Sequence, residues 1–228
     1  MIRAILFDFN GVIADDETPH FSCFQQALAE ARLSLAEEDY YGRYLGMDER
    51  TCARLLLERR DGTCDEAELS RIANRKAELF RAHTVSHKPL LFPGVVEFVT
   101  TAKKQYRLAI ASGGRKAQIE EALAGTPIEA AFEVIVSAEN CPIGKPDPAI
   151  YLMTLKRLND LRPTDDGIAA GECLVVEDSV AGIRSAKAAG MRVIGLATTY
   201  PIEKLQEADL AVASLQGMTP EWATGRLP

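Results

Sequence analysis

Residues 5–11 read Ile5-Leu6-Phe7-Asp8-Phe9-Asn10-Gly11, a short apolar run that passes directly into an acidic residue and a turn. The apolar residues have β propensity, and Gly11 is typical of a sharp turn. Asp8 is therefore expected at the carboxyl end of a strand, the edge where open α/β sheets bind their ligands. The stretch predicts a sheet whose first strand ends in a functional carboxylate.

Further apolar runs of similar length recur along the chain, with helical patterns between them. The runs cover residues 108–111, 134–136, 173–176, 193–196 and 210–212. Helical patterns cover 116–123, 148–158 and 179–189, and the last of these begins at a serine N-cap and stops at Gly190. Short apolar strands that alternate with helices predict an α/β fold, in which a parallel sheet is covered on both faces.

The segment 15–88 differs in composition and is expected to be entirely helical. It has almost no β-branched runs, and its apolar residues recur at helical spacing, as in Phe21, Phe24, Ala27, Leu28 and Ala31. The turn signal Pro93-Gly94 marks the return to the sheet. We therefore predict a domain of some four helices, 15–88, inserted into a core formed by 1–14 and 89–228, with a loosely held tail after Pro220.

The composition argues against several classes of function. The chain has 228 residues, of which 47% are hydrophobic and 26% charged, typical of a soluble globular protein. A formal charge of -7 disfavours binding to nucleic-acid phosphates. Five scattered cysteines without a CxxC pair predict free thiols in a reducing cytoplasm. Only Arg3 precedes Asp8 as a charge, and no apolar run reaches about 18 residues, so neither a signal peptide nor a membrane span is expected.

Polar residues that could bind a ligand or take part in a reaction lie at three further strand ends. The run Ser112-Gly113-Gly114 lies between a strand and a helix, where backbone N–H groups and a hydroxyl can hold phosphate oxygens. Lys145 lies in the turn-rich stretch 144–148. Glu177 and Asp178 leave an apolar strand together, which is costly unless a cation lies among them. Mg²⁺ suits such carboxylate oxygens and keeps phosphate in its shell.

The order of these four groups resembles the four motifs of the haloacid dehalogenase superfamily, the first of which reads Asp-x-Asp-Gly-(Thr/Val). The resemblance implies a Rossmann-like parallel sheet core with an inserted all-helical cap domain. Within the insert, Gly46-Met47-Asp48-Glu49-Arg50 and Asn74-Arg75-Lys76 look like the β-phosphoglucomutase and phosphoglycolate phosphatase branch.

The resemblance also implies roles for individual residues. Asp8 takes the position of the nucleophile, and Ser112 takes that of the residue that binds the transferring phosphoryl group. Lys145 takes the position of the lysine that neutralises the charge of the phosphoryl group and of Asp8. The substrate-binding residues would include Gly113, Gly114 and Arg115 in the core and His20, Arg50 and Lys76 in the cap. Arg50 lies one place off the family pattern.

Asn10 stands where phosphatases and mutases of the superfamily have the aspartate that acts as general acid/base. An amide neither takes nor gives a proton near pH 7, so proton transfer is expected to be impaired. Its backbone oxygen is unaffected by the change, and the resemblance implies a Mg²⁺ held by Asp8, Glu177, Asp178 and that oxygen. Asn10 is compatible with an engineered substitution, with a natural variant that hydrolyses slowly or uses another acid/base, and with loss of catalysis.

These inferences predict a Mg²⁺-dependent phosphatase that hydrolyses a small phosphorylated metabolite through an aspartyl-phosphate on Asp8. A hexose-phosphate mutase similar to β-phosphoglucomutase is one alternative, and a non-catalytic phosphometabolite-binding protein is another. The protein is expected to be a cytoplasmic monomer or weak dimer, with no nucleic-acid or membrane partner.

Overall fold

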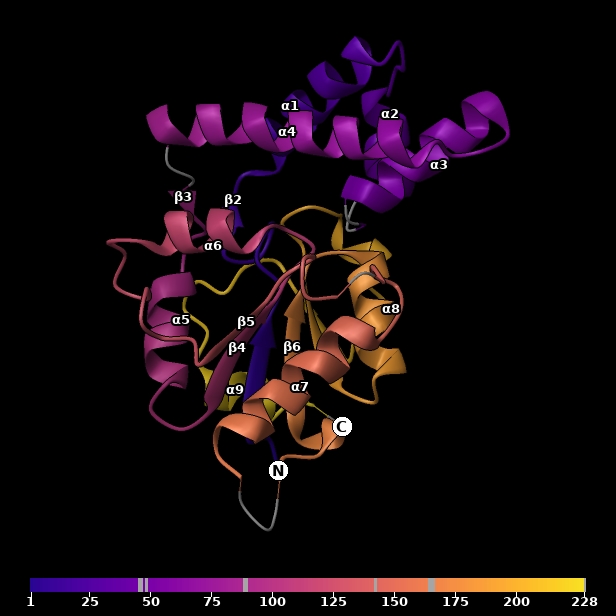
Figure 1. Ribbon diagram of the computed structural model, residues 1–228. Helices are drawn as coiled ribbons and strands as arrows, with labels where there is room; N and C mark the ends of the chain where they lie inside the picture. The colour runs from indigo at the N-terminus through magenta and orange to yellow at the C-terminus, as the bar shows by residue number, and fades with distance from the viewer. Residues whose placement is uncertain (45–46, 48, 88–89, 142, 164–166, 228) are drawn as a thin grey trace.

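The computed structural model describes residues 1–228 apart from 45–46, 48, 88–89, 142, 164–166 and 228. Six parallel strands form one sheet in the order β5-β4-β1-β6-β7-β8 (Figure 1). Their bounds are β1 Ala4–Phe7, β4 Arg107–Ala111, β5 Val134–Val136, β6 Cys173–Glu177, β7 Arg192–Leu196 and β8 Leu210–Val212. The predicted α/β fold and its parallel sheet are confirmed, because every expected apolar run forms a strand.

Alternate residues of the first strand pack on opposite faces of the sheet. Ile5 and Phe7 belong to one hydrophobic cluster, with residues of α5 Val95–Ala102, α6 Lys116–Leu123 and α9 Pro220–Thr224. Ala4 and Leu6 belong to a second cluster, with residues of α7 Ala149–Leu161 and α8 Val180–Ala188. Successive side chains of a strand point to opposite faces of the sheet. Because helices cover both faces here, each strand needs a continuous apolar run rather than alternating apolar and polar residues.

The strand register brings the polar groups to one edge of the sheet. Phe7 lies opposite Ile110 of β4 and Val176 of β6. Asp8, Ser112 and Glu177 therefore lie at the same edge of the sheet, although Glu177 is still paired with Gly195 of β7. Two short 3-10 helices, Ala170–Glu172 and Ile202–Lys204, lie in the connections around β6 and β7.

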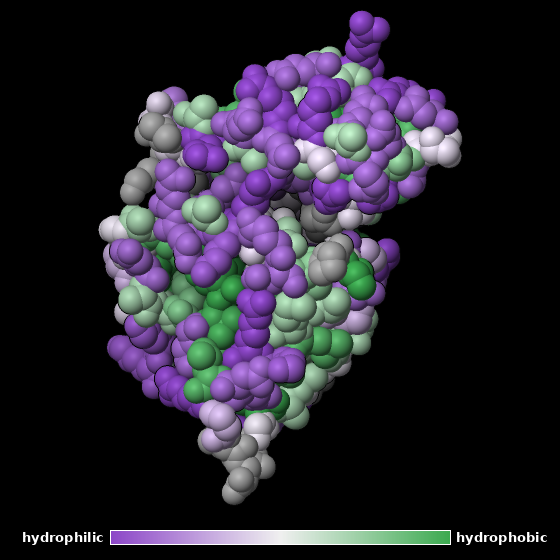
Figure 2. All heavy atoms as spheres, viewed as in Figure 1, coloured by the Kyte–Doolittle hydropathy of each residue, from purple (hydrophilic) through white to green (hydrophobic). Residues whose placement is uncertain are grey.

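The insert is helical and has a hydrophobic core of its own. Its elements are α1 Glu17–Glu30, α2 Glu37–Asp39, the π-helical turn η1 Tyr40–Tyr44, α3 Glu49–Asp61 and α4 Glu66–Ser86. Their shared core includes Phe24, Leu28, Leu57, Leu69 and Ile72. Figure 1 shows these helices above the sheet edge that carries Asp8, and Figure 2 shows mainly hydrophilic side chains over this cap on the face in view.

The two chain segments that join cap and core pair with each other. Ala14–Asp15 (β2) and Leu90–Leu91 (β3) form a two-stranded antiparallel sheet. Strands of two residues are too short to leave a periodic pattern, so the sequence did not indicate them. The division into 1–14, 15–88 and 89–228 remains our proposal, and its boundary at 88–89 lies outside the described residues.

The expectation of a loosely held tail after Pro220 is wrong. Pro220–Thr224 form α9, whose Ala223 is fully buried in the cluster that includes α5. Thr219 caps this helix by accepting a hydrogen bond from the backbone N–H of Trp222. The segment is held because it covers apolar surface of the sheet. In the described part of the chain, no helix combines the length and apolarity that crossing a membrane requires.

Candidate active site

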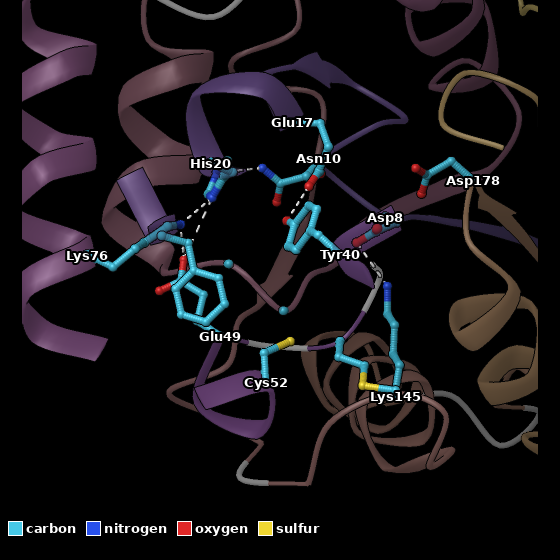
Figure 3. Close-up of a pocket in the computed structure, with 14 residues that line it drawn as sticks. Asp8, Asn10, Glu17, His20, Tyr40, Glu49, Cys52, Lys76, Lys145 and Asp178 are labelled. Carbon is cyan, nitrogen blue, oxygen red and sulfur yellow. Dashed lines mark hydrogen bonds and ion pairs between the residues drawn. The ribbon is translucent and has the colours of Figure 1, made fainter. Parts of the chain in front are cut away.

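A pocket lies where the cap meets the carboxyl edge of the sheet (Figure 3). Core residues that line it are Asp8, Asn10, Gly113, Gly114, Lys145 and Asp178. Cap residues that line it are Glu17, His20, Phe24, Tyr40, Met47, Glu49, Cys52 and Lys76. Most of the residues singled out from the sequence thus meet in one place, although they come from five separate stretches of chain.

Asp8 is held at the end of β1 by the neighbouring strand and by a lysine. Its backbone N–H donates to Val176 O at 3.0 Å, and Lys145 Nζ lies 2.9 Å from its Oδ1. Apart from this ion pair, the buried Oδ1 has no hydrogen-bond partner. Burial is the main cause that raises the pKa of Asp8 to about 7. The charge of Lys145 lowers this pKa, and the charge of Glu177 raises it further.

Glu177 is fully buried and both of its carboxylate oxygens are occupied. Oε1 accepts from Lys145 Nζ and, at 2.8 Å, from the Tyr151 hydroxyl. Oε2 accepts from the backbone N–H groups of Asp178 and Ser179 and from the Ser179 hydroxyl, each at 3.0 Å. Glu177 therefore fixes the ammonium group of Lys145 beside Asp8. Although burial disfavours the charged amine, Asp8 and Glu177 raise the pKa of Lys145.

Asp178 completes a cluster of three carboxylates with Asp8 and Glu177. One carboxylate oxygen from each of the three residues lies within 4.8 Å of the others. Among the described residues, this is the one group of three such side chains that could hold a metal ion. Burial and the charges of Glu177 and Asp8 raise the pKa of Asp178 well above its usual value. Gly11, at φ 76°, makes room for this carboxylate, since a Cβ there would lie 2.0 Å from Asp178 Oδ2.

The donor set of this cluster suits a hard divalent cation. Of the three buried carboxylates, Asp8 and Glu177 pair with Lys145, and Oδ1 of Asp8 has no hydrogen-bond partner. Such an excess of buried negative charge is costly without a further cation, and carboxylate oxygens are the ligands that Mg²⁺ prefers. The residues therefore fit the metal that the family resemblance implies. Because the oxygens of Glu177 are already occupied, Asp8 and Asp178 offer the accessible ones.

The segment after β4 forms the opposite wall of the pocket. Ser112 is fully buried, donates from its backbone N–H to Val136 O at 2.9 Å, and accepts from Gly114 N–H at 3.0 Å. Gly113 and Gly114 line the pocket. A side chain at Gly114 would approach Ser112 Oγ and Asn10 Oδ1 at 3.3 Å, so the glycine keeps the backbone open to a ligand.

Asn10 faces both the segment after β4, at Ser112, and the cap. Its Oδ1 lies 3.5 Å from Ser112 Oγ. Its Nδ2 donates to both oxygens of Asp16 at 2.8 Å and lies 3.0 Å from His20 Nε2. The side chain therefore connects the core loop to α1, which carries His20. No signal in the sequence pointed to Asp16, because an aspartate before a helix reads as an ordinary N-cap.

The cap contributes a buried cation with its counter-ions. Lys76 is 1% exposed, donates to Glu49, and contacts His20 Nδ1, as Figure 3 shows. His20 also stacks on Phe80, with ring centroids 3.8 Å apart. Burial opposes ionisation of Glu49, but Lys76 and His20 lower the pKa of Glu49 to about 2. His20 and Lys76 thus lie where the sequence placed them, at the pocket.

Arg50 and Arg115 lie beside this pocket rather than in it. Arg50 pairs with Glu66 at 2.7 Å and contacts Ser70 at 3.2 Å. Arg115 Nη2 lies 3.3 Å from Asn74 Oδ1, across the junction of core and cap. Both arginines line an adjoining depression. Their roles in substrate binding remain predictions, and Gly46 and Asp48 of the same stretch lie outside the described residues.

Glu17 and Tyr40 are cap residues of the pocket that the sequence did not single out. The Tyr40 hydroxyl donates to Glu17 Oε1, and both groups line the pocket. Burial raises the pKa of Glu17, and burial with the neighbouring Glu17 charge raises that of Tyr40 well above its usual value. Only the folding of η1 against α1 brings the two together, so no local spacing could indicate them.

Comparison with known proteins agrees with this geometry. Residues 2–190 match the family of haloacid dehalogenase-like hydrolases. The chain belongs to this family. The superfamily resemblance read from the four motifs is thereby confirmed, as is the Rossmann-like core with a helical cap, because solved structures of this family superpose over nearly the whole chain.

Several relatives in this family are named as phosphatases or as CbbY proteins. The chain is 31% identical over 207 residues to Protein CbbY of Rhodobacter capsulatus, which covers 87% of each. It is 31% identical over 199 residues to the phosphorylated carbohydrates phosphatase of Thermotoga maritima, covering 86% of this chain and 85% of the relative. The expected enzyme class, a phosphoric monoester hydrolase of the haloacid dehalogenase type, is supported by these relatives.

Two solved structures show the shared fold. A β-phosphoglucomutase from Clostridium difficile has a TM-score of 0.85 at 23% identity and covers 99% of this chain and 97% of its own. A CbbY variant from Rhodobacter sphaeroides, in which one aspartate is replaced by asparagine, has a TM-score of 0.81 at 26% identity, covering 97% and 99%. That variant was crystallised with xylulose 1,5-bisphosphate.

Proposed function

We propose that this chain is a Mg²⁺-dependent phosphatase that hydrolyses a small phosphorylated carbohydrate through an aspartyl-phosphate on Asp8. The observation that carries the proposal is the pairing of Asp8 with Lys145, beside Asp178, in the pocket between core and cap. The carbohydrate class is supported by the names of the relatives, which include the phosphorylated carbohydrates phosphatase and a hexitol phosphatase of Escherichia coli.

In this mechanism the residues of the core hold and attack the phosphoryl group. A carboxylate oxygen of Asp8 attacks phosphorus, the bond to the sugar oxygen breaks, and water later releases phosphate and regenerates the carboxylate. Lys145, the Ser112 hydroxyl and the backbone N–H group of Gly113 would bind the phosphoryl oxygens, while the N–H group of Gly114 holds Ser112 Oγ. Asp8, Asp178 and the backbone oxygen of Asn10 would hold Mg²⁺, which when bound offsets the negative charge of the phosphate.

The cap half of the pocket would recognise the part of the substrate that leaves. Glu17, Tyr40, Glu49, His20 and Lys76 present acceptors and donors around one hollow. Such a set matches the hydroxyl groups of a sugar or sugar alcohol, each of which both donates and accepts. Sequestration by the cap would also strengthen the electrostatic contacts in the site.

Asn10 makes the enzyme slow in the proton-transfer steps. The departing sugar oxygen needs a proton, and the attacking water must lose one, but an amide does neither. The loss of a positioned acid/base typically costs about 10² to 10⁴ in rate. Phosphoenzyme on Asp8 should therefore accumulate when the leaving group needs no proton, as with acetyl phosphate.

The decisive experiment incubates the purified protein with Mg²⁺ and acetyl phosphate and measures the intact mass. A phosphate adduct that is absent from Asp8→Asn would support the proposal. A phosphate-release screen over sugar and sugar-alcohol monophosphates then identifies the substrate class. If neither an adduct nor phosphate release appears with any compound, the protein is a binding protein rather than an enzyme.

A hexose-phosphate mutase is the second candidate, because an amide at Asn10 slows hydrolysis of the phosphoenzyme. The chain is 26% identical over 226 residues to the β-phosphoglucomutase of Bacillus subtilis, covering 96% of this chain and 93% of the relative. Conversion of β-glucose 1-phosphate to glucose 6-phosphate, without net phosphate release, would favour the mutase. The cytoplasmic location and the monomeric or weakly dimeric state remain predictions.

A further inference from the structure

We infer that Asp16 is a positioning residue that sets the orientation of the Asn10 amide, so that the two residues form one matched amide–carboxylate pair. Asp16 is 2% exposed and lies at the start of the cap, whereas Asn10 belongs to the core loop after β1. The inference goes beyond the proposed function, and only the activity arm of its test rests on that function.

The contacts with the carboxylate of Asp16 favour one orientation for the amide. Both oxygens of Asp16 lie 2.8 Å from Asn10 Nδ2, and a carboxylate accepts but does not donate. Rotating the amide by half a turn would place its oxygen against that carboxylate, so Nδ2 faces Asp16 and Oδ1 faces the other way. Oδ1 then lies 3.5 Å from Ser112 Oγ, on the side where the phosphoryl group would bind.

The helix start supplies a second, independent observation. Asp16 occupies the N-cap position of α1, yet its side chain caps no backbone N–H group. Asp65, at the same position of α4, does cap its helix, by accepting from Ala67 N–H and Glu68 N–H. An N-cap aspartate normally makes such bonds, so the carboxylate of Asp16 has exchanged them for the amide of Asn10.

The pairing predicts that replacing Asn10 by aspartate, with Asp16 unchanged, destabilises the protein. In Asn10→Asp, a half-buried carboxylate would face the buried carboxylate of Asp16 at the distance now spanned by hydrogen bonds, which is unfavourable. Exchanging the two residues, in Asn10→Asp with Asp16→Asn, keeps the composition and net charge and restores one donor and one acceptor. The exchanged pair would hold a carboxylate, instead of an amide oxygen, toward Ser112.

The experiment is a double-mutant cycle of the full chain with Asn10→Asp, Asp16→Asn and their combination. With Mg²⁺ and a sugar monophosphate that the parent hydrolyses, we expect Asn10→Asp alone to change kcat by less than about 10-fold. The exchanged double variant should gain about 10² to 10⁴ in kcat, the usual contribution of a positioned acid/base, with KM nearly constant. Asp15→Asn, which removes the same charge from the exposed neighbour, is the control and should have no effect.

Melting temperatures of the same variants give a readout that does not depend on activity. Asn10→Asp should lower Tm by about 3–6 °C, and the added Asp16→Asn should restore it. Additive effects of the two substitutions on Tm would overturn the inference, as would a full gain in kcat from Asn10→Asp alone. A complete lack of turnover in all variants, with a non-additive Tm cycle, would contradict the proposed function and leave the pairing supported.

Discussion

Lys145 holds its ammonium group 2.9 Å from Asp8 and hydrogen-bonds to the buried carboxylate of Glu177, so that one cation lies between two acids from neighbouring strand ends. Glu177 is in turn fixed by Tyr151 and Ser179. Asp8 is thus positioned by a chain of contacts that runs back into α7 and to the N-cap of α8. This arrangement places a charged lysine where the charge of a transferring phosphoryl group would develop.

Replacing Asp8 by asparagine should abolish phosphoryl transfer without unfolding the protein, because the two side chains have nearly the same shape. Phosphate release and the phosphoenzyme mass should both disappear, while at about pH 4, where Asp8 is protonated in the fold, Tm stays close to that of the parent. Asp160→Asn, at an exposed position, is the control. Substantial turnover in a sample shown by mass spectrometry to be free of deamidation would remove Asp8 as the nucleophile.

The metal-free protein should lose stability through Asp8 as the pH rises from about 4 to about 7. The pKa of Asp8 is 3.8 ordinarily and about 7 in the fold. Between these values the folded state binds the extra proton, so this contribution is complete below the lower pKa and vanishes above the higher one. In EDTA, Tm of Asp8→Asn should therefore rise relative to the parent across this range. A difference that is independent of pH would contradict the shifted pKa.

Asp178→Asn should remove Mg²⁺ binding and activity together, whereas Glu177→Gln should act mainly on stability. Asp178 offers an accessible carboxylate beside Asp8, but both oxygens of Glu177 accept hydrogen bonds within the protein. The NH₂ group of a glutamine would face the N–H and O–H groups that now donate to the carboxylate, which should lower the free energy of unfolding by about 1–3 kcal/mol. Titration calorimetry and thermal melts separate the two effects. Unchanged Mg²⁺ affinity in Asp178→Asn would show that the metal site is misassigned.

Gly11→Ala should eliminate activity, while Gly62→Ala should only destabilise the protein slightly. The two glycines have φ values of 76° and 75°, so the backbone strain is matched. A Cβ at Gly11 would lie 2.0 Å from Asp178 Oδ2, but nothing lies within 4 Å of one at Gly62. Strain alone costs about 1 kcal/mol. Equal activity loss in both variants would mean that conformation, and not the space for Asp178, decides the effect.

Lys76→Met should weaken use of a sugar phosphate and spare acetyl phosphate. Lys76 is buried in the cap half of the pocket with Glu49 and His20, where only the sugar would reach it. Losing a hydrogen bond to a charged group predicts a fall in kcat/KM of about 10- to 100-fold, mainly through KM. Arg75→Met, next in the sequence but half-buried and paired with Glu30, is the control. Equal losses for both phosphate donors would place Lys76 outside sugar recognition.

The local sequence pattern is sufficient to predict the sheet and the polar residues that lie at the ends of its strands. Buried parallel strands need continuous apolar runs, and the runs at 5–7, 108–111 and 173–176 could hardly form anything else between their turns. Once these strands are parallel and adjacent, Asp8, Ser112 and Glu177 must reach the same edge. The core half of the candidate site is therefore readable from the chain alone.

The partners of those side chains were decided only by the tertiary structure. Arg50 and Glu49 are neighbours on α3, and adjacent helical residues point in different directions, so packing alone determined that Glu49 faces the pocket. Asp16 has the sequence of an N-cap, yet the approach of α1 to the loop after β1 turned it toward Asn10. Hydrogen bonds between segments depend on distances that no local periodicity encodes, and these bonds are what give Asn10 its orientation.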